Sequence, residues 1–177
     1  NRNRDKFSVF EDASAYYAAT AAFMRFRGGY VEYGNICDAG VAAVDMRGRF
    51  LFWDRDHTHH HSYDLSSYSA TDQTYLLRTI FRNAVGRHGE KKGYGVVTGE
   101  PEAEIYVNYG RSTLKKNVVY LLATDGFEKY LQEQSFRKAL STMDRNQIRK
   151  TMARLKKLHK GDGEFLAEKT LVAVRPD

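Results

Sequence analysis

A carboxylate stands where a buried strand is expected to end. Asp125 lies in the stretch VVYLLATDGFEKYL, between an apolar run at 118–123 and a helix-like stretch that begins at Phe127. Burying an unpaired charge is costly, so a strand can end on an aspartate where solvent or a cation meets the side chain. Asp-Gly after a strand is also common turn chemistry. These residues alone leave both interpretations open.

Two other groups of side chains could do chemistry. The stretch His57 to His61 reads HTHHH, but zinc sites draw their ligands from separate elements, which favours a polar loop over a metal site. Cys37 has no base evident beside it in the sequence, which favours a packed thiol at a strand end over a nucleophile. Because it is the only cysteine, an internal disulfide is excluded and a reducing compartment is expected.

The strongest charge signal lies near the C-terminus, in a stretch without an acidic residue after Asp144. Its cations are Arg145, Arg149, Lys150, Arg154, Lys156, Lys157 and Lys160. An RNA phosphate backbone or an acidic protein surface would suit such a face. A solvated outer helix would show the same pattern, and the net charge of +6 fits either interpretation.

The first third of the chain predicts strands. Short apolar runs at 19–26, 30–36, 40–45 and 49–53 are separated by glycine or charge. This spacing indicates a meander of four strands joined by tight turns. Because aromatic residues fall on both faces of the second run, one face is expected to pack on a second sheet and the other on helices.

The middle of the chain predicts a helix followed by two strands. Thr71 or Asp72 can cap a helix over 71–86, Gly86 can close it, and apolar residues recur at helical spacing from Leu76 to Val85. The runs 103–110 and 117–124 then read as strands buried on both faces, with a basic loop at 111–116 between them.

The remainder predicts helices and one final strand. Short amphipathic turns at 127–131 and 136–140 precede a longer helix that starts near Asp144 and ends at Gly161. Its apolar stripe is Ile148, Met152, Leu155 and Leu158, and a strand at 169–174 closes the chain. Strands, helix, strands, helices and strand in this order predict an α+β layered domain, with sheet on sheet and helices outside.

Taken in order, these stretches resemble the metal-dependent protein phosphatases of the type 2C family. VVYLLATDGFEKYL resembles the family's strand-Asp-Gly-helix motif. GNICDAGVAAVDMRGRFLFWDRDHT is similar to a segment with Gly-Asp-Ser and Asp-His-Thr, with Cys37-Asp38-Ala39 in place of the former. IFRNAVG, EKTLVAVR and NRDKFSV resemble a helix end, the last strand and the family's first motif. The resemblance covers nearly the whole chain.

The resemblance implies a layered α-β-β-α sandwich of two antiparallel sheets flanked by helices, shortened relative to the family. It also implies two Mn²⁺ or Mg²⁺ ions in a carboxylate cleft at one edge, because hard cations bind oxygen ligands. Asp125 would be a metal ligand, and Asp38 is the second candidate. Such ions would generate a hydroxide that attacks a phosphoserine or phosphothreonine phosphorus.

The sequence departs from the family at the metal ligands. Nothing matches the Asp-Gly-x-Gly-Gly motif that supplies a bridging aspartate, and only residues 10–36 lie between NRDKFSV and CDAG. Ala167-Glu168 replaces the Asp-Asp pair before the last strand, and alanine has no oxygen to offer. Arg2 and Arg4 are poor substitutes for the phosphate-binding arginine. These losses predict a degenerate, catalytically inactive relative that carries no cofactor.

The expected function follows from these departures. We expect a single domain, 1–177, that acts as a structural or regulatory subunit of a larger assembly such as a ribonucleoprotein, with protein partners and RNA. Two alternatives stay open: an active Mn/Mg-dependent serine/threonine phosphatase whose first metal-binding loop is missing from this chain, and a free-standing RNA-binding module. No apolar run is long enough for a membrane helix, so we expect no membrane partner and an intracellular location, in the cytoplasm or an organelle matrix.

Overall fold

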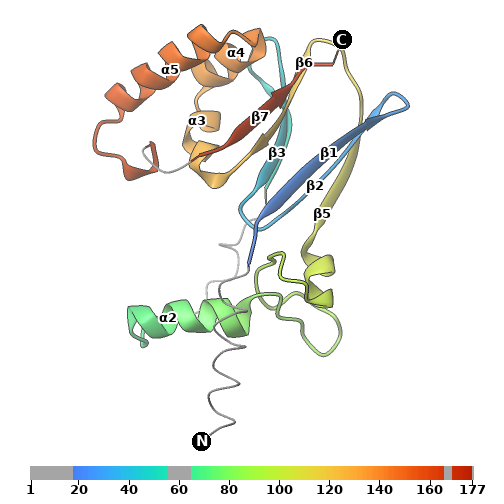
Figure 1. Ribbon diagram of the computed structural model, residues 1–177, viewed down its shortest axis with the longest axis vertical. Helices are drawn as coiled ribbons and strands as arrows, with labels where there is room; N and C mark the ends of the chain where they lie inside the picture. Colours follow the sequence, from blue (N-terminus) through green and yellow to red (C-terminus); the bar gives the residue numbers. More distant parts are fainter. Residues whose placement is uncertain (1–17, 56–64, 166–168, 177) are drawn as a thin grey trace, which may run out of the picture.

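Two antiparallel sheets form the centre of the protein (Figure 1). The computed structural model describes residues 18–55, 65–165 and 169–176. In the first sheet, of order β1-β2-β5, the strands are β1 (Ala21–Arg27), β2 (Tyr30–Ile36) and β5 (Asn108–Thr113). In the second, of order β4-β3-β6-β7, they are β3 (Gly40–Asp45), β4 (Phe50–Arg55), β6 (Val118–Ala123) and β7 (Leu171–Val174).

Helices flank this pair of sheets. The α-helices are α2 (Ala70–Leu76), α3 (Glu128–Gln132), α4 (Gln134–Thr142) and α5 (Arg145–Leu158). Shorter turns are the π-helix η2 (Leu77–Phe81) and the 3-10 helices η3 (Pro101–Tyr106), η4 (Asp125–Phe127) and η5 (Gly163–Phe165). Helices α3, α4 and α5 lie beside the second sheet, whereas α2 lies at the far end of the molecule (Figure 1). The predicted α+β class, with two antiparallel sheets and flanking helices, is confirmed.

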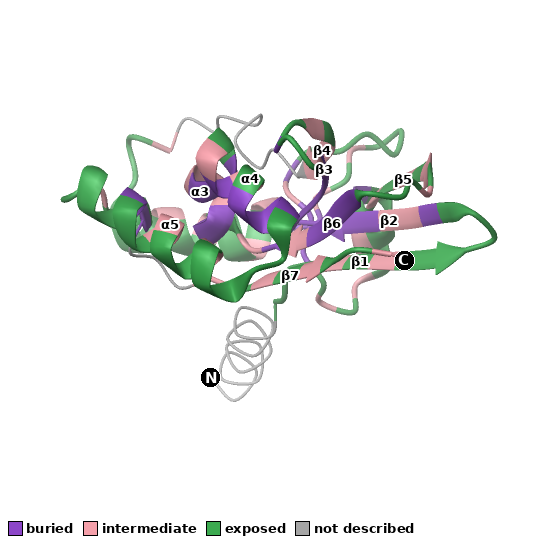
Figure 2. Ribbon diagram, turned by 90° about the horizontal axis from the view of Figure 1, so that it is seen from above, coloured by how far each residue is buried: buried purple, intermediate pink, exposed green. Residues whose placement is uncertain are grey.

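The main core lies between the second sheet and helices α3 to α5, where buried residues concentrate (Figure 2). Phe127, Tyr130 and Phe136 form an aromatic cluster with ring centroids 5.3–5.8 Å apart. The cluster packs with Leu121 of β6 and Leu155 of α5. Burial of this apolar surface is the main stabilising contribution to this half of the fold.

A smaller cluster joins the two sheets. It contains Val31 of β2, Ala43 of β3, and Val118 and Tyr120 of β6. Beside it the rings of Tyr33 and Phe52 stack with centroids 4.3 Å apart. Strand β3 is therefore covered on both faces, which explains why GVAAV has no polar residue.

The predicted four-strand meander is only partly right. The hairpins β1–β2 and β3–β4 form as expected, but β2 pairs with β5 and β3 pairs with β6. The short link Cys37–Ala39 carries the chain from one sheet to the other. Cys37 adopts a left-handed conformation with φ 66°, which turns the chain out of the first sheet in place of a hairpin.

The predicted helix over 71–86 ends earlier and begins with a different cap. Ser69 is the N-cap, and its Oγ accepts a hydrogen bond of 3.2 Å from the Asp72 amide. The helical segment stops at Phe81, because Arg82 is extended and Asn83 adopts a left-handed φ of 47°. Its apolar side chains stay at the surface, Ile80 among them.

Two other boundaries differ from the sequence prediction. Residues 101–106 form the 3-10 helix η3, with Pro101 at its start, so the strand expected at 103–110 begins instead at Asn108. Strand β5 continues through Thr113 into the segment expected as a basic loop. Its residues alternate between half-buried and exposed, so one face of the strand is partly covered and the other is exposed. The strand expected at 117–124 and the final strand are confirmed as β6 and β7.

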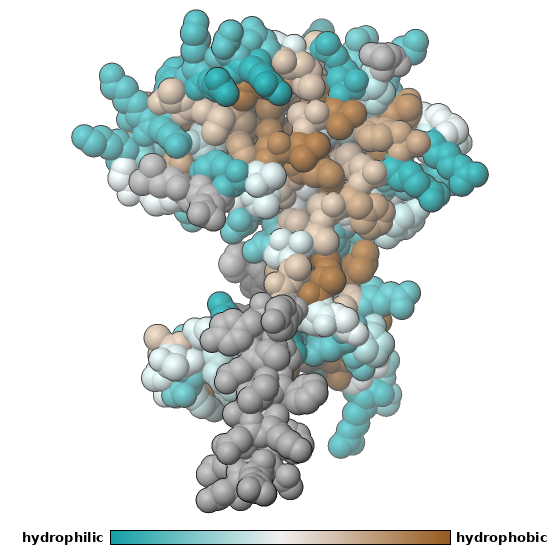
Figure 3. Space-filling view, viewed as in Figure 1, coloured by the Kyte–Doolittle hydropathy of each residue, from teal (hydrophilic) through white to brown (hydrophobic). Residues whose placement is uncertain are grey.

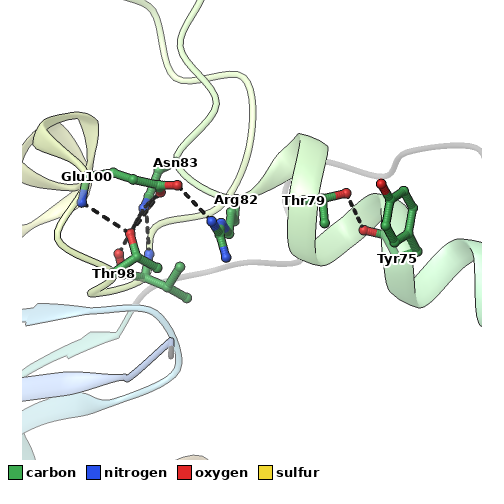
Figure 4. A network of polar contacts seen from close by, with 7 residues as sticks. Tyr75, Thr79, Arg82, Asn83, Thr98 and Glu100 are labelled. Atoms are coloured by element: carbon green, nitrogen blue, oxygen red, sulfur yellow. Dashed lines mark hydrogen bonds and ion pairs between the residues drawn. The ribbon is translucent and has the colours of Figure 1, made fainter. Parts of the chain in front are cut away.

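A polar network holds the segment that follows the helix (Figure 4). Asn83 Nδ2 donates to Glu100 Oε2 at 2.7 Å and to Val96 O at 3.0 Å, while Asn83 Oδ1 accepts from the Val96 amide at 2.9 Å. Arg82 Nη2 lies 2.8 Å from Glu100 Oε1. Burial raises the pKa of Glu100, but the hydrogen bonds from Asn83, Thr98 and Arg82 outweigh it and hold that pKa below its ordinary value. Glu100 is therefore the anionic centre that ties this loop together.

Candidate functional site

Four segments of the second sheet meet at one edge. Gly40 of β3 pairs with Ala123 of β6 and with Arg55 of β4, and Ala123 also pairs with Leu171 of β7. Because these strands are antiparallel, Asp38 precedes β3 and Asp125 follows β6 at the same edge. The sheet register thus brings together the two aspartates that the sequence singled out.

Asp125 begins the 3-10 helix η4 and is exposed to solvent. Its Oδ1 accepts a hydrogen bond of 2.7 Å from the Gly126 amide. The strand end is fixed next to it by Thr124 and Thr170, with Thr124 N donating to Thr170 O at 3.1 Å and Thr170 N donating to Thr124 Oγ1 at 3.0 Å. The carboxylate is therefore solvated and caps a turn, which is enough to explain a charge at this strand end.

Asp38 lies in the link between the two sheets. Its side chain is exposed, between the buried residues Cys37 and Ala39. Asn35 Nδ2 donates to Ala39 O at 2.9 Å and closes this link from the first sheet. Cys37 is the buried thiol at a strand end that the sequence favoured, and its left-handed φ is the conformation for which glycine is best suited.

A lysine that the sequence analysis missed lies at the same edge. Lys169 Nζ donates to Phe165 O at 3.0 Å and to Gly126 O at 3.3 Å, and it lies 4.9 Å from the centre of the Tyr130 ring. Partial burial lowers the pKa of Lys169, the charge of Lys156 lowers it further, and Asp125 opposes them. Lys169 lies two residues before β7, and no sequence motif marked it.

The described residues do not fit a site for two divalent ions. In residues 18–55, 65–165 and 169–176, no three His, Cys, Asp or Glu side chains come together as a metal-binding group. The described carboxylates at this edge are the exposed Asp38 and Asp125. The ammonium group of Lys169 is bonded to the carbonyl of Gly126, next to Asp125, and a positive charge there repels divalent cations. The His57–His61 stretch and Ala167-Glu168 lie outside the described residues.

Replacing Lys169 with methionine tests how far the ammonium group stabilises this edge. The change removes the donor to two carbonyl groups and keeps most of the apolar volume. We expect the free energy of unfolding to fall by about 1 kcal/mol, a modest value because the ammonium group is partly solvated. Urea unfolding measures the change, and Lys169→Arg is the charge-preserving control. An unchanged midpoint for Lys169→Met would contradict a stabilising role.

No protein-family model and no curated protein sequence matches the chain. Among solved structures, the photosystem II phosphatase PBCP is 12% identical, with a TM-score of 0.49 over 80% of this chain and 46% of that one. PppA, a regulatory component of the Pseudomonas aeruginosa T6SS, is 17% identical, with a TM-score of 0.49 over 88% and 56% of the two chains.

A third structure is the catalytic domain of the serine/threonine phosphatase PstP with two manganese ions. It is 14% identical, with a TM-score of 0.47 over 92% of this chain and 65% of that one. The chain spans about half the length of PBCP and PppA.

The residues of the basic stretch lie on α5 and, for Lys160, in the turn that follows it. Asp144 is the N-cap, and its Oδ1 accepts from the Asn146 amide at 2.8 Å and from the Gln147 amide at 3.3 Å. The seven cations, all exposed, are Arg145, Arg149, Lys150, Arg154, Lys156, Lys157 and Lys160. The predicted apolar stripe is wrong at one position, because Leu158 is 72% exposed where the helix ends.

Proposed function

We propose that the chain is a single phosphatase 2C-like domain that has lost phosphatase catalysis and acts as a structural or regulatory subunit of a larger assembly. The observation that carries this proposal is the position of Lys169. Its ammonium group is hydrogen-bonded at the edge where the family resemblance would require divalent cations. A positive charge next to Asp125 disfavours binding of a divalent cation, and an ammonium group does not generate a nucleophilic hydroxide.

The ligand set supports the same conclusion. A binuclear site needs several converging oxygen donors, and the described part of the edge offers Asp38 and Asp125. The resemblance aligns Ala167 with a metal-ligating aspartate, and a methyl group cannot replace that oxygen. We therefore propose that neither Mn²⁺ nor Mg²⁺ is a cofactor of this protein.

The test is a phosphatase assay on the full chain with phosphoserine and phosphothreonine peptides, with and without Mn²⁺. We expect the same rate as the peptide blank, no Mn²⁺ dependence, and the same result for Asp125→Ala. Metal content of the purified protein, measured by mass spectrometry, is expected to be below one ion per chain.

Turnover that requires Mn²⁺ and disappears in Asp125→Ala would overturn the proposal. That result would favour the alternative, an active serine/threonine phosphatase completed by a metal-binding loop missing from this chain. The assembly part of the proposal has a separate readout, because the native protein is expected to sediment well ahead of an isolated chain of 177 residues. Sedimentation as a monomer in native extract would contradict it.

A further inference from the structure

The cations of α5 and of the turn that follows it are all exposed at the surface. We use "α5 basic face" for Arg145, Arg149, Lys150, Arg154, Lys156, Lys157 and Lys160. No ion pair to any of these seven occurs among the described residues. Hydrophilic side chains project over this part of the molecule in the space-filling view (Figure 3). Seven exposed positive charges without a counter-charge are a candidate for binding an anionic partner.

The stability of the helix does not account for this arrangement. Arg145 and Arg149 are four residues apart, as are Lys150 and Arg154, and like charges at this spacing destabilise a helix. Lys156 and Lys157 suit the negative end of the helix dipole, but Arg145 occupies the positive end, where an acidic residue would be favourable. The charge pattern therefore costs stability, which points to a role outside the fold.

The spacing of the charges matches a regular polyanion. Arg145, Arg149 and Lys156 share one side of α5 and are separated by about 6 and 10 Å along its axis. Lys150 and Lys157 lie opposite the buried Leu155 and face outward. Together they cover a helix about 21 Å long, a length over which one nucleic-acid strand presents several phosphates.

The chemistry of this face favours nucleic acid over protein. Protein interfaces have an apolar or aromatic centre that is depleted of charge, and the exposed face of α5 offers only Ala153 and Leu158 as apolar residues. Binding to a phosphate backbone requires cations and no apolar anchor. Arginine adds a planar fork that matches phosphate oxygens.

Two features of α5 further restrict the class of nucleic acid that it could bind: it has no aromatic residue, and one of its faces packs against the core. Unpaired bases are bound by stacking on aromatic rings, and α5 carries none. Ile148, Met152 and Leu155 hold the helix against the core, so only its outer face is available to a partner. The wide, shallow minor groove of A-form RNA admits such a surface. We propose that the α5 basic face binds the phosphate backbone of double-helical RNA.

This inference goes beyond the proposed function and is independent of the metal edge, so either can fail alone. The experiment is fluorescence anisotropy of the full chain with a labelled RNA duplex of about 20 base pairs, a length that exceeds the span of a typical duplex-binding domain. Titrations run from low to physiological KCl concentration. With about five phosphate contacts, we expect log Kd to vary with log salt with a slope of magnitude about 4 to 5.

Two variants with equal charge change separate the α5 basic face from net charge. Arg145→Gln, Arg149→Gln and Lys156→Gln are combined in one variant, and Arg87→Gln, Lys115→Gln and Lys116→Gln in the control. All six side chains are exposed, so both variants are expected to fold, which circular dichroism verifies. The α5 variant should weaken binding on the order of 100-fold at low salt and lower the slope by about 3, and the control should change either quantity far less.

Three outcomes would overturn the proposal. The first is equal loss of binding in both triple variants, which would reduce the effect to net charge. The second is tighter binding to a DNA duplex of the same length than to RNA. The third is binding of polyglutamate, but not RNA, that is lost in the α5 variant, which would assign the face to an acidic protein. If the α5 triple variant does not fold, Lys150→Gln combined with Lys157→Gln repeats the measurement on the outward side.

Discussion

Asn83→Ala is expected to lower the free energy of unfolding by about 3–4 kcal/mol. The change leaves the amide and the carbonyl of the buried Val96 without their Asn83 partner and removes one of the hydrogen bonds to Glu100. An unsatisfied buried polar group costs about 1–3 kcal/mol. Alanine must also adopt the left-handed φ of 47°, which costs about 1 kcal/mol more. Urea unfolding gives the total, and hydrogen exchange at the Val96 amide reports the local loss.

Asn83→Gly is the matched control, because it removes the same side chain but relieves the backbone strain. We expect it to be about 1 kcal/mol more stable than Asn83→Ala. Wild-type exchange protection of the Val96 amide in Asn83→Ala would contradict the role assigned to the network.

Phe136→Ala is expected to cost about 3–5 kcal/mol, the range observed for truncating a buried aromatic side chain. Phe136 is 0% exposed, and the centre of its ring lies 5.8 Å from that of Phe127 and 5.3 Å from that of Tyr130. Its removal opens a cavity where α3, α4 and β6 meet, and the rigid sheet cannot collapse to fill it. The midpoint and slope of urea unfolding together measure this cost.

Two controls on the same helix frame the result. Phe136→Leu keeps most of the volume and should cost about 1–2 kcal/mol, and the exposed Gln134→Ala should stay within about 0.5 kcal/mol of wild type. A cost below 1 kcal/mol for Phe136→Ala would mean that the aromatic cluster is not the centre of the core.

Periodicity and capping correctly predicted the elements whose structure depends mainly on residues close in the sequence. Asp144 marked the start of α5, and the uninterrupted apolar runs marked β3, β6 and β7. Strands β3 and β6 are covered on both faces, and β7 pairs with β6. The apolar residues of these runs therefore match the burial of the strands. The clustering of cations on α5 was also visible in the sequence, because no acidic residue lies between Arg145 and Lys160.

The errors arose where contacts with residues far away in the sequence determine the end of a helix or the pairing of a strand. Asn83 ends the helix expected to reach Gly86 because its partners Val96 and Glu100 lie more than ten residues onward. The pairing of β2 with β5 depends on a segment beyond residue 107, so the sequence could not separate one meander from two sheets. Lys169 joined the site through the backbone carbonyls of Gly126 and Phe165, which no motif encodes.

The two-sheet topology has a consequence for synthesis on the ribosome. Strand β3 lies between β4 and β6, and the intervening segment 56–117 must be translated before its second neighbour exists. Strand β7, at residues 171–174, then pairs with β6. Until β6 has been translated, the nascent chain carries the apolar GVAAV segment with one edge unpaired, which is the condition that recruits chaperones. The second sheet therefore cannot form completely before residues 171–174 have been translated.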